Sequence, residues 1–157
     1  MLATISQRLK HYMPSAVDSE EKNASSKAAV MLLLHGDPLN PHIILTERAK
    51  HLNHHAGEVA FPGGMKESCD QNLLATALRE TEEEIGVHES KIELFGQLTS
   101  VYIPPSDFTV TPYVGVIRGE PNFKRCHREV EQIVRAPLNQ LMEPKALTSG
   151  TVTRSNG

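Results

Sequence analysis

Residues 63–87 read GGMKESCDQNLLATALRETEEEIGV and contain the most informative pattern in the chain. At about 100° per residue, a helix over residues 72–85 gathers several side chains in one narrow stripe, which is its expected buried face. The members of this stripe are Leu74, Leu78, Thr81 and Ile85. Gly86 follows the stripe and allows the left-handed backbone that ends many helices. The pattern predicts an amphipathic helix packed against a core.

The same helix carries three acids, Glu80, Glu83 and Glu84, which share one side and lie opposite the stripe. Like charges at this spacing cost a few tenths of a kcal/mol per pair, and the helix dipole disfavours anions near this end. Arg79 is the only fixed cation between residues 68 and 90, and it can hold Glu83 four residues later. Clustered carboxylates on a rigid element suit Mg²⁺ or Mn²⁺, so we expect a divalent-cation site. The alternative is a solvated acidic face.

The composition narrows the class of protein. The chain has 157 residues, which is enough for one domain with a sizeable core. Its 16 Lys and Arg against 19 Asp and Glu argue against general affinity for nucleic acid or a membrane surface. Its two cysteines make no disulfide framework, and no apolar run approaches the ~20 residues that span a bilayer. We expect a cytoplasmic protein without nucleic-acid or membrane partners, and a homodimer is left open.

Strand-like segments surround the predicted helix. They lie at residues 28–34, 42–46, 91–96 and 108–117, and turn residues between the first two predict a hairpin. Pro112 indicates a bulge or an edge position in the last of these segments. Residues 127–142 begin with an acidic segment that looks helical. This order predicts an α/β fold, with a mixed β-sheet in a sandwich.

The two ends of the chain differ from its middle. Apolar residues recur at near-helical spacing in residues 2–13, so we expect residues 1–26 to form a short helix and a polar linker. The main domain is expected over residues 27–157. Residues 150–157 combine β-branched residues with a final Asn-Gly, a common hairpin-turn signal. A returning strand is expected beyond them, so we interpret the chain as truncated; a frayed tail is the alternative.

The string RETEEEIGV, residues 79–87, resembles the second half of the Nudix box, Arg-Glu-apolar-x-Glu-Glu-x-Gly-apolar. Thr81 stands where an aliphatic residue is more common. In its first half the box has Gly, five residues, Glu and seven residues before the Arg. Counting back from Arg79 puts Gln71 at the Glu position and Met65 at the Gly position. The glycine pair therefore lies one residue early.

That one-residue insertion resembles the coenzyme A pyrophosphatase branch of the Nudix family. Residues 45–64, LTERAKHLNHHAGEVAFPGG, are similar to the upstream signature of that branch. The resemblance implies a Nudix-type α/β/α sandwich. It also implies hydrolysis of coenzyme A or acyl-coenzyme A to phosphopantetheine and adenosine 3′,5′-bisphosphate. The alternatives are hydrolysis of NADH, ADP-ribose or a nucleotide sugar, and a Nudix-fold binding module without catalysis.

The resemblance also implies roles for single residues. The expected metal ligands, which would hold Mg²⁺ or Mn²⁺, are Glu80, Glu83, Glu84 and the backbone carbonyl of Gly63. Arg79 matches the arginine that orients a catalytic carboxylate. A metal-activated water is expected to attack one phosphorus of the diphosphate.

Two further sets of residues remain open. The general base is expected to be Glu80, or one of two acids in a later segment, Glu129 and Glu131. Arg48 and Lys50 are expected phosphate contacts, for instance to a 3′-phosphate, and a structural salt bridge is the alternative for Arg48. His54 matches the family signature and is a third expected substrate contact.

Overall fold

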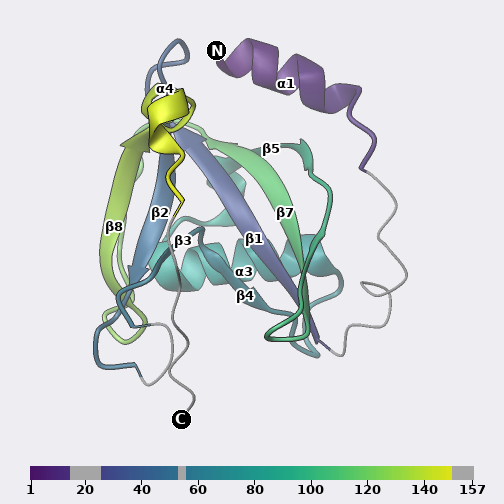
Figure 1. Ribbon diagram of the computed structural model, residues 1–157, viewed down its shortest axis with the longest axis vertical. Helices are drawn as coiled ribbons and strands as arrows, with labels where there is room; N and C mark the ends of the chain where they lie inside the picture. Colours follow the sequence, from purple (N-terminus) through teal and green to yellow (C-terminus); the bar gives the residue numbers. More distant parts are fainter. Residues whose placement is uncertain (15–25, 53–55, 150–157) are drawn as a thin grey trace.

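A computed structural model of the chain describes residues 1–14, 26–52 and 56–149 (Figure 1). Among these residues, eight strands form one mixed sheet. The strands are β1 (Ser26–His35), β2 (His42–Arg48), β3 (Val59–Ala60), β4 (Gly63–Met65), β5 (Ile92–Gln97), β6 (Val101–Ile103), β7 (Phe108–Ile117) and β8 (Val130–Pro137). The helices are α1 (Leu2–Lys10), α3 (Leu73–Ile85) and α4 (Leu138–Leu141), with 3-10 turns at Glu89–Lys91 and Pro144–Ala146. The polar linker beyond residue 14 and the strand expected at residues 150–157 lie outside the described residues.

Strand β1 runs through the middle of the sheet. It pairs in parallel with β7 along most of its length, and antiparallel with β2 around the pair Leu33↔Ile44. The β1–β2 pairing confirms the hairpin expected from the turn residues between them. On the far side of β7 lies β5, and on the far side of β2 lies β8.

Strands β1 and β2 separate away from their hairpin, and residues 59–65 fill the space between them. We call residues 59–65 the wedge. Its first part, β3, pairs with β2 at Thr46↔Ala60, and its last part, β4, pairs with β1 at Ala29↔Gly64. The wedge therefore lies inside the sheet, next to the face that α3 covers.

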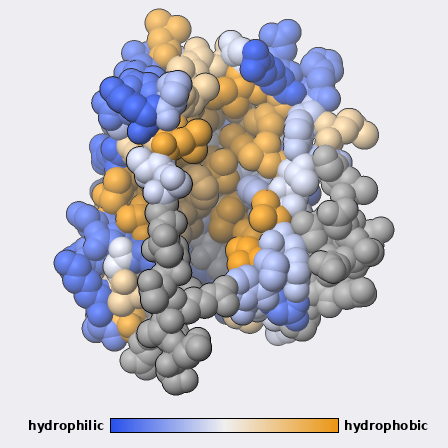
Figure 2. All heavy atoms as spheres, viewed as in Figure 1, coloured by the Kyte–Doolittle hydropathy of each residue, from blue (hydrophilic) through white to orange (hydrophobic). Residues whose placement is uncertain are grey.

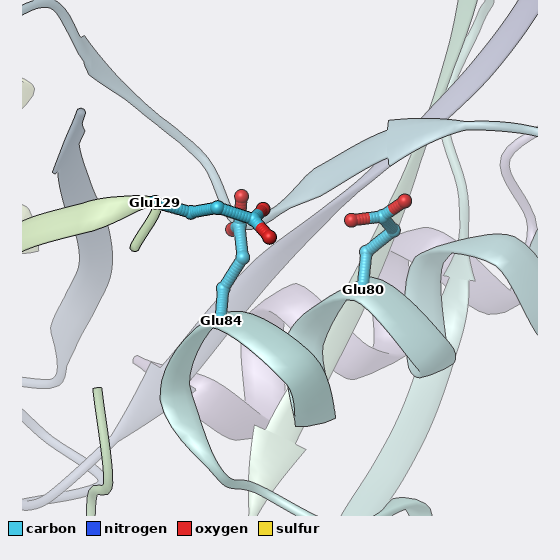
Figure 3. Close-up of side chains that lie close together, drawn as sticks. All are labelled: Glu80, Glu84 and Glu129. Atoms are coloured by element: carbon cyan, nitrogen blue, oxygen red, sulfur yellow. The ribbon is translucent and has the colours of Figure 1, made fainter. Parts of the chain in front are cut away.

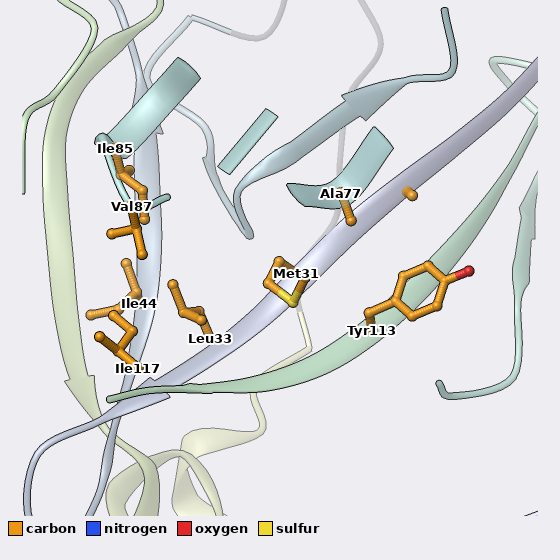
Figure 4. Close-up of a cluster of buried hydrophobic side chains, with 9 residues drawn as sticks. Met31, Leu33, Ile44, Ala77, Ile85, Val87, Tyr113 and Ile117 are labelled. Carbon is orange, nitrogen blue, oxygen red and sulfur yellow. The ribbon is translucent and has the colours of Figure 1, made fainter. Parts of the chain in front are cut away.

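Alternate residues of β1 supply two hydrophobic cores, because side chains along a strand point to opposite faces. Met31 and Leu33 are fully buried against Ala77 and Ile85 of α3 (Figure 4). Leu34 packs on the other face, which α1 partly covers. Each large side chain buried in this way contributes about 1.5–3 kcal/mol. The sheet thus lies between two helical layers, which confirms the expected α/β/α sandwich with a mixed sheet.

Helix α1 covers only part of its face of the sheet. The backbone N–H of Leu2 donates to the Pro38 carbonyl at 2.9 Å, and the Tyr12 hydroxyl bonds to Thr99. Between Leu9 of α1 and Ile43 of the sheet an apolar hollow of about 280 Å³ remains. Figure 2 shows apolar residues gathered around this hollow. In the described parts of the chain, every helix is too short or too polar to cross a bilayer.

The expectation of a helix at the start of residues 127–142 is wrong. Residues 130–137 form strand β8, which pairs antiparallel with β2. Three of the first five residues of β8 are β-branched, and these favour a pleated, half-buried strand. Val130 is almost fully buried, so burial against the sheet outweighs the helical appearance of the acids around it.

Pro112 lies in an interior strand, so the expected edge position is also wrong. Strand β5 pairs with β7 as far as Tyr113, and β6 pairs with it from Val110, which leaves Pro112 between the two partners. The Pro112 carbonyl accepts from the Leu98 backbone N–H at 2.9 Å. In a strand the N–H of a residue points the same way as its carbonyl, so the missing donor faces the interruption between β5 and β6.

Candidate functional site

Helix α3 is bounded by two local signals. The side chain of Asn72 accepts a hydrogen bond from the Ala75 backbone N–H at 2.9 Å and caps the first turn. At the other end Gly86 adopts φ 73° and ψ 22°, and its N–H donates to the Glu82 carbonyl at 2.8 Å. These bounds confirm the helix expected over residues 72–85, including its left-handed end at Gly86.

The buried face of α3 is wider than the expected stripe. Thr76, Ala77 and Glu84 are buried together with Thr81 and Ile85. The expectation that the acids lie opposite the buried face is therefore wrong for Glu84, of which only 6% is exposed. The reason is the wedge, which covers this side of the helix and could not be located from the periodicity of the helix alone.

Thr81 occupies a fully buried position on this face. Its hydroxyl donates to the Ala77 carbonyl one turn earlier, at 2.6 Å. This bond satisfies the polar atom within the helix, so the side chain packs much as an aliphatic residue would. The departure from the usual box residue at this position therefore leaves no unpaired group in the core.

The glycine pair of the wedge allows a very close approach to α3 and β1. The Gly63 backbone N–H donates to Glu84 Oε2 at 3.3 Å. A Cβ on Gly63, whose φ is +156°, would lie 2.3 Å from the Ala29 carbonyl oxygen. A Cβ on Gly64 would lie 2.5 Å from the carboxylate carbon of Glu80. Only glycine fits at either position.

Three carboxylates converge beside the wedge: Glu80 and Glu84 from successive turns of α3, and Glu129 from the residue before β8 (Figure 3). One oxygen of each lies within 4.8 Å of the others. We call these three residues the acid cluster. The backbone of Glu129 is held because its carbonyl accepts from the Ala49 N–H at 2.8 Å, while its side chain is exposed.

The electrostatics of the acid cluster are unfavourable without a cation. Burial raises the pKa of Glu84 to about 7, and the nearby Glu80 and Glu129 raise it further against the opposing effects of Gly63 and Arg48. Burial also raises the pKa of Glu80, although Arg79 opposes that change. Hard oxygen donors from two elements, one of them deeply buried, are a donor set that fits Mg²⁺ or Mn²⁺.

Arg79 lies on the other side of Glu80 and binds four partners. It forms a two-pronged ion pair with Asp70, with Nε to Oδ1 and Nη2 to Oδ2 both at 3.0 Å. Its Nη1 donates to Glu80 at 3.0 Å and to Glu83 at 3.1 Å, and its Nη2 donates to the Met65 carbonyl at 3.1 Å. The contact expected between Arg79 and Glu83 is therefore present. We call Asp70, Arg79, Glu80 and Glu83 the arginine clamp.

Asp70 was not singled out from the sequence. Only 4% of its side chain is exposed, and the Arg79 guanidinium holds the pKa of this carboxyl well below its usual range. Asp70 in turn raises the pKa of Arg79. The available signal was its place, nine residues before Arg79 and next to Gln71.

The other expected site residues fall into different surroundings. Glu83 lies outside the acid cluster, with 55% of its side chain exposed while it pairs with Arg79. Arg48, at the end of β2, is partly buried, and its Nε has no hydrogen-bond partner among the described residues. Lys50 is exposed just beyond β2, Glu131 is partly buried within β8, and His54 lies outside the described residues.

Comparisons with known proteins agree with this fold. The chain is 40% identical over 121 residues to the uncharacterized Nudix hydrolase NudL of Salmonella paratyphi B, which covers 74% of this chain. The same identity and coverage are found for NudL of Salmonella enteritidis. The chain spans 60% of the length of these relatives.

Solved structures with the same fold are more distant in sequence. A C. elegans Ap4A hydrolase in a binary complex matches with a TM-score of 0.63 at 14% identity, covering 74% of this chain and 83% of that one. The NUDIX domain of Shewanella oneidensis NrtR, complexed with ADP ribose, matches with a TM-score of 0.56 at 19% identity, covering 87% and 85%. The family model for the NUDIX domain matches residues 25–154, which include the wedge, α3 and Glu129. Because that match spans both the helix with its box-like acids and the strands that position them, the chain belongs to the Nudix family.

Proposed function

We propose that this protein is a divalent-cation-dependent pyrophosphohydrolase, which cleaves the diphosphate bridge of a nucleoside diphosphate derivative. The observation that carries the proposal is the acid cluster. A buried Glu84 with a pKa raised to about 7 lies within 4.8 Å of two further carboxylates. A fold that keeps acids in such an arrangement pays for it in stability unless a cation joins them.

Glu80 and Glu84 would hold Mg²⁺ or Mn²⁺, and the Gly63 carbonyl is proposed as a backbone ligand. When bound, the cation lowers the pKa of a coordinated water and neutralises charge that develops on the bridging oxygen. The chain contributes rigidity: Arg79 and Gly64 confine the Glu80 carboxylate between them. The exposed Glu83 serves the arginine clamp in this proposal, and is not needed as a ligand.

Glu129 is proposed as the general base. Its side chain is exposed to water, whereas the other two acids of the cluster are partly or fully buried. It also comes from a different element and receives no printed hydrogen bond from Arg79, which donates to Glu80. Glu129 can therefore take a proton from the attacking water while the helix acids hold the cation. In Glu129→Gln we expect kcat to fall while Mn²⁺ affinity is retained.

Coenzyme A or an acyl derivative is the proposed substrate. The support is the signature at residues 45–64, together with the cations that this segment provides. The charge of Arg48 lowers the pKa of Glu84, so the guanidinium lies near the acids and can neutralise phosphate oxygens there. Lys50 is exposed beyond β2 and is proposed, with His54, for the 3′-phosphate.

The test is incubation with Mg²⁺ or Mn²⁺ and a panel of coenzyme A, acyl-coenzyme A, NADH, ADP-ribose and a nucleotide sugar, with products identified by mass. We expect phosphopantetheine and adenosine 3′,5′-bisphosphate from coenzyme A. Faster hydrolysis of another compound would replace the substrate but keep the enzyme class. Binding without turnover of any compound would favour the non-catalytic module.

The same assay tests the phosphate contacts. If Lys50 binds the 3′-phosphate, 3′-dephospho-coenzyme A loses a charge-assisted contact worth ~1.5–3 kcal/mol, or roughly tenfold or more in kcat/KM. In Lys50→Ala the two compounds should become nearly equal substrates. Equal rates in the unmodified protein would remove the reason for assigning this residue.

A further inference from the structure

The carboxylate of Asp70 is buried and saturated with hydrogen bonds. Besides the two bonds from Arg79, its Oδ2 accepts from the Thr76 hydroxyl at 3.0 Å and from the Glu67 backbone N–H at 2.8 Å. The Asp70 N–H returns a bond to the Glu67 carbonyl at 3.1 Å, and Lys66 Nζ donates to the Asp70 carbonyl at 2.8 Å. Both the side chain and the backbone of Asp70 are therefore fixed, and such a residue can serve as an anchor.

One guanidinium connects this anchor to the acid cluster. Arg79 uses Nε and Nη2 for Asp70, and this ion pair fixes the plane of the group. The remaining nitrogen, Nη1, is then directed at Glu80 Oε1 at 3.0 Å. Glu80 packs against the Cα of Gly64 on its other side, so its carboxylate has little freedom. The orientation of Glu80 thus depends on where Asp70 holds Arg79.

The spacing before the helix explains why the anchor is Asp70. At the Glu position of the box the chain has Gln71, whose side chain is exposed. The turn over residues 67–70, closed by the Asp70 carboxylate and N–H, directs Asp70 inward instead. The extra residue after the glycine pair is thereby absorbed in the loop, and an acid still reaches Arg79.

We propose that Asp70 is a positioning residue for the cation site, which acts through Arg79 to hold the Glu80 carboxylate. The proposal rests on the proposed function, because it assumes that Glu80 is a cation ligand. Without Asp70, Arg79 is free to turn toward Glu83 and Glu67, both of which it already contacts within 4.0 Å. Residues that hold metal ligands in place typically change metal affinity by about 10–100-fold when they are substituted.

The test is titration of the metal-free protein with Mn²⁺, followed by electron paramagnetic resonance, beside the melting temperature of each variant. We expect Asp70→Asn to weaken Mn²⁺ binding about tenfold or more. In a Glu80→Gln background the same substitution should have almost no further effect on affinity, because the group it positions is already altered. A purely structural role would lower the melting temperature equally in both backgrounds and leave affinity unchanged.

Leu34→Ala is the matched control, since it removes a buried side chain from the opposite face of the sheet and should lower the melting temperature without changing affinity. If Asp70→Asn does not fold, Thr76→Val removes one bond to Asp70 at lower cost, and a loss of affinity of about threefold is expected. Unchanged affinity in the folded variant would overturn the role of Asp70. Unchanged affinity in Glu84→Gln would instead overturn the cation site itself, and the role of Asp70 with it.

Discussion

Asp70 and Glu84 are both buried carboxylates of one loop-and-helix unit, and burial affects them in opposite ways. The Asp70 side chain is 4% exposed and receives four hydrogen bonds, two of them from Arg79, which keep its pKa far below the usual range. Glu84 is 6% exposed and receives a long bond from Gly63, and its pKa rises to about 7. Burial alone disfavours a charge, and partners reverse that effect. A buried acid with few partners is therefore the one available to a ligand.

The difference follows from which side of Arg79 each acid lies on. Arg79 can neutralise only the acids within its reach, and those are Asp70, Glu80, Glu83 and Glu67. Glu84 is one turn beyond Glu80 and faces the wedge. The helix thus has a neutralised end at the arginine clamp and an unneutralised end at the acid cluster.

Activity should separate these two ends most strongly. Glu84→Gln keeps the shape of the side chain but removes a charge from the acid cluster, so we expect kcat/KM to fall by about 10²–10⁴. Glu82→Gln is the matched control, because Glu82 is exposed on another side of the same helix. Comparable activity in the two variants, measured at saturating Mg²⁺, would contradict a catalytic role for the acid cluster.

Stability should respond in the opposite way. Asp70→Asn leaves a partly buried guanidinium without its main partner, and breaking a buried ion pair costs about 3–5 kcal/mol. Glu84→Gln in metal-free protein should leave the free energy of unfolding unchanged or raise it, because repulsion within the acid cluster falls. Urea unfolding of both variants checks this pair of signs. A larger loss in Glu84→Gln than in Asp70→Asn would reverse the comparison.

The pH dependence of metal-free stability sharpens the comparison further. The folded pKa of Glu84, about 7, lies above its ordinary value of 4.5, so its contribution is fully present below pH 4.5 and is lost as pH rises toward 7. This difference corresponds to about 3 kcal/mol. Asp70 has the opposite sign, and its contribution is lost as pH falls below 3.8. Unfolding free energies between pH 4.5 and 7.5 should slope downward in the unmodified protein and flatten in Glu84→Gln.

The smallest effect is expected at Thr76. Thr76→Val removes a hydroxyl that donates to the charged Asp70 at 3.0 Å, and such a bond contributes about 1.5 kcal/mol. Asn72→Ala, which removes the cap of the same helix without touching Asp70, should cost about 1 kcal/mol. Of the two, only Thr76→Val should change Mn²⁺ affinity. A loss of affinity in Asn72→Ala would mean that helix stability, not the arginine clamp, controls the site.

Local patterns allowed α3 and most strands to be predicted from the sequence. The period of the helix, its glycine end and the apolar runs of β1 and β7 are properties of neighbouring residues, so they can be recognised without the fold. The contact of Arg79 with Glu83 is equally local, since four residues separate them along one helix.

The burial of the acids could not be predicted in the same way. It depends on the wedge between β1 and β2, and on Glu129, which is far from α3 in the sequence. β8 was misassigned because its acids hid a strand whose partner, β2, lies more than 80 residues earlier. Asp70 was missed for a different reason: the register of the box drew attention to Gln71, and the turn at residues 67–70 decides which of the two faces inward.

Mn²⁺ binding tests the central claim most directly, because it asks whether the acid cluster holds a cation and requires no substrate. The metal-free protein, Glu84→Gln and Glu82→Gln would each be titrated with Mn²⁺ at pH 7.5 by isothermal titration calorimetry. We predict that Glu82→Gln binds as tightly as the unmodified protein and that Glu84→Gln binds at least about tenfold more weakly. Equal affinities in all three would contradict the account, since the acid cluster would then be a solvated surface.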